Sequence, residues 1–227
     1  EELKKFSEKK KLNFLSTPYD TQSVDFLENI GVKRYKTASA DLYDLNLHER
    51  IIETGKPVII SVGMSSLKDV KISLDLYKKK KYKNVSILHC VSNYPCSLES
   101  LNLNCIKLLK EEFNYNVGFS DHSMGFLAST VAVSLGAKII EKHFTLNNNM
   151  IGPDHKTSLN PKNFSEFVKL VKNTQIILGS KHKKIQKEEL NMLKGSRKSL
   201  TLINKKKKNK KIKSSDISLK RPGLGLS

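Results

Sequence analysis

Short apolar runs recur along the chain, and each is followed by a segment whose apolar residues repeat with helical periodicity. The six runs are residues 13–17, 34–39, 57–61, 85–90, 117–122 and 138–143. Apolar residues are nearly continuous within each run, which indicates strands covered on both faces, as in a parallel sheet. One strand and its helix take roughly 20–30 residues, the size of a βα unit. The pattern therefore predicts six consecutive strand–helix units.

Glycine marks the expected helix ends. Apolar residues at helical spacing precede Gly31, Gly55, Gly136 and Gly179, and glycine commonly follows the last turn of a helix. A further helix is predicted over residues 1–11, ahead of the first strand.

Polar side chains end every predicted strand. They are Ser16, Thr17, Ser39, Ser61, His89, Ser120, Asp121, His122, Glu141, Lys142 and His143. An open doubly wound sheet binds ligands only at its switch point, whereas all strand ends of a (β/α) barrel face one site. No glycine-rich phosphate loop follows the first predicted strand. We therefore predict an α/β protein with a TIM (β/α)8 barrel whose first two strands are missing upstream of Glu1.

The repeating pattern ends near residue 180. We expect a partial TIM barrel, strands 3–8, over residues 1–180 and a polar linker over residues 181–196. A strand predicted at residues 197–203 opens a small second module over residues 197–227, which stops too soon to close a core of its own.

Composition narrows the class of protein. Of the 227 residues, 38% are apolar and 28% are charged, and no window approaches the roughly 18 apolar residues of a membrane span. Three cysteines without a CxxC motif exclude a disulfide scaffold and are typical of reduced thiols. We expect a cytoplasmic protein with no membrane partner.

The basic charge is concentrated in the last quarter of the chain. The net charge is +19, and residues 181–227 hold 16 of the 41 Lys and Arg residues but only three of the 22 acidic residues. Such a tail suggests either a nucleic-acid partner or a solvated lysine-rich loop. Only four of these cations along the chain are Arg, and no aromatic residue interrupts the lysine run at 205–208. We expect no nucleic-acid partner, because Arg is the better reader of phosphates and base edges.

Two histidines suggest a metal site. His122 and His143 end neighbouring predicted strands, and Glu141 shares the face of His143 because alternate side chains of a strand point the same way. Two imidazoles with oxygen donors suit a divalent metal that keeps open positions. A structural, hydrogen-bonded role is the alternative for each histidine, and no third protein ligand is evident.

An anion site is predicted next to the metal site. Lys36 supplies a cation, and three hydroxyls end the same or nearby strands, those of Ser39, Ser61 and Ser120. Lysine with hydroxyl donors can hold a phosphate or carboxylate. A Schiff-base lysine at Lys36 or Lys142 is the alternative, against which the histidine pair argues.

Cys90 and a polar loop that contains Asp154 and His155 are weaker indications of function. Cys90 could be a nucleophile, but a buried, inert thiol is the favoured interpretation. Asp154 and His155 follow Gly152-Pro153 in a loop after the last predicted strand, where a substrate contact or a simple turn would fit.

Seven segments together resemble the sialic acid synthase family, which includes N-acetylneuraminate, legionaminate and pseudaminate synthases. The segments are FLSTPYD (14–20), YKTAS (35–39), SVGM (61–64), LHCVSNYP (88–95), GFSDH (118–122), IEKHFT (140–145) and GPDHK (152–156). The resemblance implies a TIM barrel with a C-terminal antifreeze-protein-like (SAF) domain, here truncated. It also implies condensation of phosphoenolpyruvate with an N-acetylated hexosamine, such as N-acetylmannosamine, to a nine-carbon 2-keto acid and phosphate.

The resemblance also assigns roles to residues. It implies a Mn²⁺ or Mg²⁺ ion on His122 and His143, with Glu141 as an active-site carboxylate. The residues implied to bind the substrates are Lys36, Ser39, Ser61, Ser92, Tyr94, Ser120, Asp154 and Arg221. Arg221 of the antifreeze-like domain is implied to reach the sugar's acetamido group in the other subunit's site, which implies a domain-swapped homodimer.

Two departures and two rival functions qualify this interpretation. An acidic residue and a second phosphoenolpyruvate-binding lysine, which the family carries on its first two strands, are not in this chain, so we expect low activity of these residues alone. The rivals are a synthase that makes a seven- or eight-carbon keto acid and a non-enzymatic basic module that binds anions.

Overall fold

The computed structural model describes residues 1–223 and 226, which form two compact units, Glu1–Leu178 and Gly179–Ser227. The first unit is built on a five-stranded sheet with the strand order β1-β2-β3-β4-β5, and all four strand pairs are parallel. Its strands are β1 (Tyr35–Thr37), β2 (Val58–Ser61), β3 (Val85–Cys90), β4 (Asn116–Asp121) and β5 (Ile140–Lys142).

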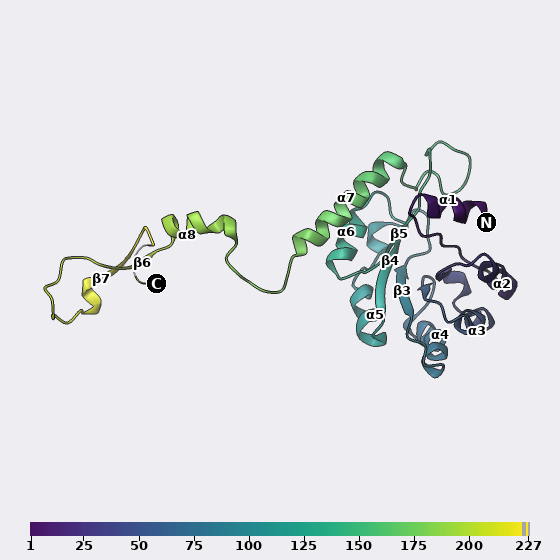
Figure 1. Cartoon of the computed structure of the whole chain (residues 1–227), viewed down its shortest axis with the longest axis horizontal. Helices are drawn as coiled ribbons and strands as arrows, with labels where there is room; N and C mark the ends of the chain where they lie inside the picture. Colours follow the sequence, from purple (N-terminus) through teal and green to yellow (C-terminus); the bar gives the residue numbers. More distant parts are fainter. Residues whose placement is uncertain (224–225, 227) are drawn as a thin grey trace. The chain divides into compact units, whose positions relative to one another are not determined.

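Helices connect successive strands of this sheet, so that sequence order and spatial order agree (Figure 1). The connecting helices are α3 (Leu45–Glu53), α4 (Leu67–Lys79), α5 (Cys105–Phe113) and α6 (Leu127–Ser134), with the short 3₁₀ turns η1 (Ser39–Asp41) and η2 (Leu98–Ser100). The helices α1 (Glu2–Lys9) and α2 (Thr21–Asn29) precede β1, and α7 (Pro161–Leu178) follows β5. The parallel sheet is that of a half-barrel, which confirms the predicted βα repeat.

The core lies between the sheet and its helices. Strand residues of one face, such as Tyr35, Ile60 and Phe119, are fully buried in one apolar cluster with Leu47 of α3 and Leu74 of α4. Each fully buried side chain of this size contributes roughly 1.5–3 kcal/mol to the free energy of unfolding. The alternate strand residues point to the opposite face, where the polar side chains gather.

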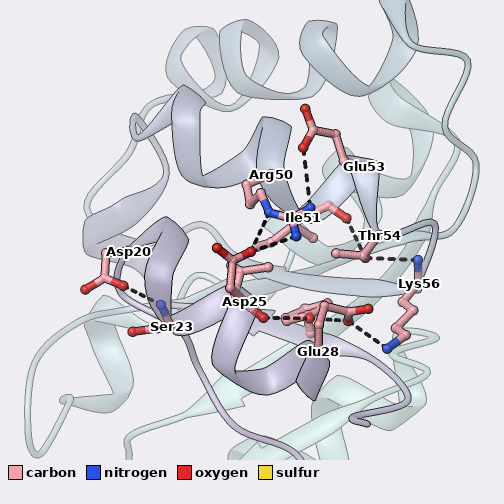
Figure 2. A network of polar contacts seen from close by, with 11 residues as sticks. Asp20, Ser23, Asp25, Glu28, Arg50, Ile51, Glu53, Thr54 and Lys56 are labelled. Carbon is pink, nitrogen blue, oxygen red and sulfur yellow. Dashed lines mark hydrogen bonds and ion pairs between the residues drawn. The ribbon is translucent and has the colours of Figure 1, made fainter. Parts of the chain in front are cut away.

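Polar contacts connect α2 to α3 and to Lys56, which follows α3 (Figure 2). Arg50 Nε of α3 donates to Asp25 Oδ1 of α2 at 2.8 Å, and Lys56 Nζ donates to Glu28 Oε1 at 2.6 Å. The Tyr35 hydroxyl of β1 also donates to Glu28. These contacts hold α2 beside β1, although no strand precedes α2.

The first predicted strand is wrong. Residues 13–17 form no strand, and the sheet of the described residues has five strands rather than six. Phe14 packs against the core, but Leu15 is exposed. A strand here could pair only with β1 at the sheet edge, and β1 is three residues long. Pro18 follows directly and cannot donate to a ladder.

The second unit contains two antiparallel strands, β6 (Ser199–Leu202) and β7 (Ile217–Lys220). β6 confirms the strand predicted at residues 197–203. The stretch predicted as a linker contains η3 (Lys187–Glu189) and α8 (Leu190–Ser196), and the 3₁₀ turn η4 (Ser214–Asp216) precedes β7. Residues 224, 225 and 227 of the predicted second module lie outside the described residues. Among the residues that the structure describes, no helix has the length and apolar character needed to cross a bilayer.

Candidate active site

One pocket of about 570 Å³ lies at the carboxyl ends of the five strands. The parallel register pairs Lys36 with Ile59, Cys90 with Ser120, and Ser120 with Glu141, so the carboxyl ends of neighbouring strands lie side by side. The predicted site residues that line the pocket are Lys36, Ser39, Ser61, Ser92, Tyr94, Ser120, His122, Glu141, His143 and Asp154. The fold therefore brings ten of the eleven predicted site residues together.

Lys36 is the buried cation of this pocket, with 7% of its surface exposed. Its Nζ donates to Ser61 Oγ at 2.7 Å and to the Thr37 carbonyl at 3.0 Å, and it lies 3.5 Å from Glu141 Oε2. The other carboxylate oxygen of Glu141 accepts a hydrogen bond from Ser120 Oγ at 2.7 Å. Lysine and carboxylate are thus each held by a hydroxyl and by each other, which compensates for the burial of the Lys36 ammonium.

The two histidine rings are neighbours across β4 and β5. The ring centroids of His122 and His143 are 5.3 Å apart, with the planes at 76°. His122 Nδ1 lies 2.8 Å from the Val91 carbonyl oxygen, which can only accept, so Nδ1 carries a proton and donates it to that carbonyl. The ring of Tyr94 lies against both imidazoles, with centroid distances of 4.1 Å to His122 and 5.2 Å to His143.

The surroundings of His143 favour its neutral form. Burial lowers its pKa, and the neighbouring His122 lowers it further, whereas the carboxylates of Asp154 and Glu141 oppose the shift. His143 Nδ1 lies 3.7 Å from Asp154 Oδ2. A neutral imidazole keeps a lone pair, which is what a metal ion needs.

The donor set fits a divalent cation that keeps open positions. Two imidazoles stand side by side, and Nδ1 of His122 is fixed by a backbone carbonyl, as is usual for metal-binding histidines. In the described part of the chain, however, no group of three or more His, Cys, Asp or Glu side chains is arranged to hold a metal. Further positions would therefore be left for oxygen ligands of a substrate or water.

Gly63 leaves room for the hydroxyls of two pocket residues, Ser39 and Ser92. The Gly63 N–H donates to Ser39 Oγ at 2.9 Å. A Cβ at Gly63 would stand 2.4 Å from Ser92 Oγ, 2.9 Å from Ser39 Oγ and 3.2 Å from the Cys90 carbonyl. Only glycine therefore leaves both hydroxyls in place.

The loop after β5 carries Asp154 to the pocket. The loop is braced by Thr145 Oγ1, which lies 2.7 Å from His155 Nδ1, and by Asn148 Nδ2, which donates to the His155 carbonyl at 2.8 Å. His155 supports the loop from within and does not line the pocket, whereas Asp154 does.

One lysine and one arginine that the sequence analysis considered do not line the pocket. The Lys142 side chain, 1% exposed, is on the face of β5 away from the pocket and lies 3.1 Å from Asp121 Oδ2. Burial lowers the pKa of Lys142, and Asp121 opposes that shift. Arg221 follows β7 in the second unit, so its contact with a substrate stays a prediction.

Six residues that line the pocket are not among the predicted site residues, although Thr17 was noted at a strand end and Cys90 as a thiol expected to be buried and inert. These are Thr17, Tyr19, Ala38, Ala40, Met64 and Cys90. Thr17 carries a signal, since it ends a predicted strand. Cys90 is 6% exposed and lies 3.8 Å from both Ser92 Oγ and His122 Nδ1.

Comparison with known proteins places the chain in a family. A family model described as the NeuB family matches residues 1–183. The chain belongs to the NeuB family. This confirms the resemblance to sialic acid synthases that the seven segments carry. The NeuB match contains every residue that lines the pocket, whereas Arg221 lies outside it.

Curated relatives and solved structures agree with the NeuB assignment. An uncharacterised protein of Methanocaldococcus jannaschii is 42% identical over 99% of this chain and 67% of its own length. The N,N'-diacetyllegionaminic acid synthase of Legionella pneumophila is 38% identical over 95% of this chain and 62% of its own length. A crystal structure of N-acetylneuraminic acid synthetase from Leptospira borgpetersenii, in complex with citrate, superposes with a TM-score of 0.79 at 36% identity, over 84% of this chain and 67% of that one. The chain thus spans about two thirds of the length of these NeuB relatives.

Proposed function

We propose that the protein condenses phosphoenolpyruvate with an N-acetylated hexosamine to give a nine-carbon 2-keto acid and inorganic phosphate. In the balanced reaction a carbon–carbon bond forms between the methylene carbon of phosphoenolpyruvate and the sugar aldehyde carbon. Water adds to the carbon that bears the phosphate ester, and the bond from that carbon to the ester oxygen breaks, which leaves the 2-keto group and inorganic phosphate. The observation that carries this proposal is the meeting of a buried lysine, several hydroxyls, two imidazoles and a carboxylate in one pocket.

The anionic substrate is assigned to the Lys36 side of the pocket. Lys36 supplies the positive charge, and Ser39, Ser61 and Ser92 supply hydroxyl donors around it. Holding the phosphate and carboxylate of phosphoenolpyruvate by fixed donors orients the methylene carbon, which is a large part of what such a site contributes to rate. Ser61 Oγ already accepts a hydrogen bond from the Lys36 ammonium at 2.7 Å, so ligand binding needs little rearrangement.

The sugar aldehyde is assigned to the histidine side. His122 and His143 would hold a Mn²⁺ or Mg²⁺ ion, which when bound supplies a Lewis acid for the aldehyde oxygen. Glu141 lies between the two halves, bonded to Ser120 and close to Lys36. From there its carboxylate can accept or return a proton during the condensation.

Tyr94 and Asp154 are assigned to the sugar, since both stand at the histidine end of the pocket. We propose further that the second unit is part of an antifreeze-like domain and that Arg221 recognises the acetamido group across a homodimer. A longer barrel with eight strands, as the family resemblance implies, is part of the same proposal.

The function is tested by incubating the protein with phosphoenolpyruvate, N-acetylmannosamine and Mn²⁺ and measuring both phosphate and 2-keto acid. We expect equal amounts of the two products. The variant His122→Ala should lose Mn²⁺ binding and at least 100-fold in turnover, whereas His182→Ala, which alters an exposed histidine of the second unit, should match the unaltered protein. Full turnover by His122→Ala would refute the assignment.

The acceptor is tested by varying the aldehyde. Legionaminate-type and pseudaminate-type diacetamido hexoses are compared with N-acetylmannosamine and with four- and five-carbon aldose phosphates. Turnover with only the short aldose phosphates would favour a synthase of seven- or eight-carbon keto acids, and turnover with none would leave a binding module.

A further inference from the structure

Three consecutive positions on β4 and β5 alternate between the two faces of the sheet. In the register of these strands Ser120 pairs with Glu141 and Asp121 pairs with Lys142, and the two histidines come next on each strand. The serine, the glutamate and both imidazoles line the pocket. Asp121 and Lys142 lie on the helix-facing side, with side chains 0% and 1% exposed.

Asp121 and Lys142 are fully satisfied by their surroundings. Lys142 Nζ lies 3.1 Å from Asp121 Oδ2 and also donates to the Ser123 carbonyl. Asp121 Oδ1 accepts from the Ser123 N–H at 2.9 Å and from Ser123 Oγ at 2.7 Å, and Oδ2 accepts from Ser129 Oγ of α6. The pair therefore joins the end of β5 to the end of β4, to the turn that follows β4, and to a helix.

The backbone pairing of β5 with β4 is short. Only three residue pairs connect it to β4, and the strand is partly exposed throughout. Beyond the last of these pairs β4 and β5 no longer pair with each other, and the carbonyls of His122 and His143 accept instead from the Cys96 N–H at 3.0 Å and the Leu159 N–H at 2.9 Å. A buried ion pair resists any displacement of one strand along the other, because separation would leave two unpaired buried charges.

We propose that Asp121 and Lys142 are positioning residues that set the spacing of the His122 and His143 imidazoles. They touch neither ring and act through the strand ends. The consequence for catalysis rests on the function proposed above, but the consequence for imidazole spacing does not.

The test removes both charges together. Lys142→Met alone would leave Asp121 charged and buried and could prevent folding, so the double variant Asp121→Asn/Lys142→Met is used. Asp121→Glu is the second variant, because it keeps both charges but forces the strand ends apart. Lys56→Met is the matched control, since Lys56 pairs with Glu28 at 2.6 Å in the same unit, away from the pocket.

The first measurement needs neither metal nor substrate. With histidine-labelled protein, nuclear Overhauser contacts between the ring protons of His122 and His143 report the 5.3 Å arrangement of the rings. We expect these contacts to weaken or vanish in the double variant and in Asp121→Glu, and to persist in Lys56→Met. Unchanged contacts in a folded double variant would overturn the proposal.

The second measurement is the Mn²⁺ dissociation constant at a temperature where circular dichroism shows every variant folded. Loss of groups that support metal ligands typically weakens metal binding 10- to 100-fold, and we expect this range for the double variant and no change for Lys56→Met. If the unaltered protein makes no keto acid but shows the ring contacts, the proposed function fails while the positioning role is still decided by the first measurement.

Discussion

Replacing Gly63 by alanine tests whether the hydroxyls of Ser39 and Ser92 form the anion site. The new Cβ would stand 2.4 Å from Ser92 Oγ and 2.9 Å from Ser39 Oγ. Ordinary contact begins near 3.4 Å, so the Ser92 hydroxyl must move by about 1 Å and the Ser39 hydroxyl by about 0.5 Å. Both are ends of short side chains that can rotate, whereas the Cys90 carbonyl at 3.2 Å is backbone and can yield only slightly.

The expected loss of stability is modest and the expected loss of binding is large. Overpacking of this kind costs roughly 1–3 kcal/mol of unfolding free energy, offset by about 0.4–1 kcal/mol because alanine restricts the unfolded chain. Each hydrogen bond to a charged group that is lost weakens binding by about 1.5–3 kcal/mol. We therefore expect the KM for phosphoenolpyruvate to rise at least about 10-fold, and about 100-fold if both hydroxyls turn away.

Steady-state kinetics with varied phosphoenolpyruvate, alongside thermal unfolding, separates the two effects. Gly195→Ala is the control, because a Cβ there meets nothing within 4 Å. The double variant Gly63→Ala/Ser92→Ala relieves the closest contact, so its thermal stability should recover while its KM stays high for want of one hydroxyl. A Gly63→Ala protein with unchanged KM would show that these hydroxyls do not contact the anion.

Two more substitutions test the fold. Burial lowers the pKa of His48, whose Nδ1 lies 2.6 Å from the Tyr77 hydroxyl. The neutral form of His48 therefore stabilises the fold above about pH 6.5, and this contribution to the free energy of unfolding is lost as the pH falls. Urea unfolding at several pH values should therefore show that the free energy of unfolding of His48→Gln falls less steeply with decreasing pH than that of the unaltered protein, by up to about 1.4 kcal/mol per pH unit. Equal slopes for the two proteins would contradict this. In Gly118→Ala the Cβ would stand 2.4 Å from the Ile139 carbonyl and 2.6 Å from Leu88 Cδ2. We expect a loss of about 3 kcal/mol or more, and a melting temperature equal to that of the unaltered protein would show that β4 and β5 can separate freely.

The sequence was most informative where a polar side chain follows directly on an apolar run that predicts a strand. Ser61, Ser120 and His122 each end an apolar run, and parallel strands in register bring such ends to one pocket, so their meeting could be predicted without a structure. The position of Lys142 was also predictable in part, because it is out of phase with Glu141 and His143 on the same strand.

Other features depend on partners that a sequence does not specify. The apolar run at residues 13–17 satisfies the pattern of a strand, but pairing depends on a neighbour, and β1 is short. The pairing of Asp121 with Lys142 needs the register of β4 against β5, which periodicity leaves open. The helix α8 was missed because the surrounding residues are mostly charged, although Leu190 and Leu193 have helical spacing.

The contact of Tyr94 with both imidazoles has an optical consequence. The chain contains seven tyrosines and no tryptophan, so its near-ultraviolet absorption and emission come from phenol rings. One of these rings lies 4.1 Å from His122 and 5.2 Å from His143. Light emitted by the unmodified protein therefore includes a signal from a ring that lines the pocket, free of the indole emission that dominates proteins with tryptophan.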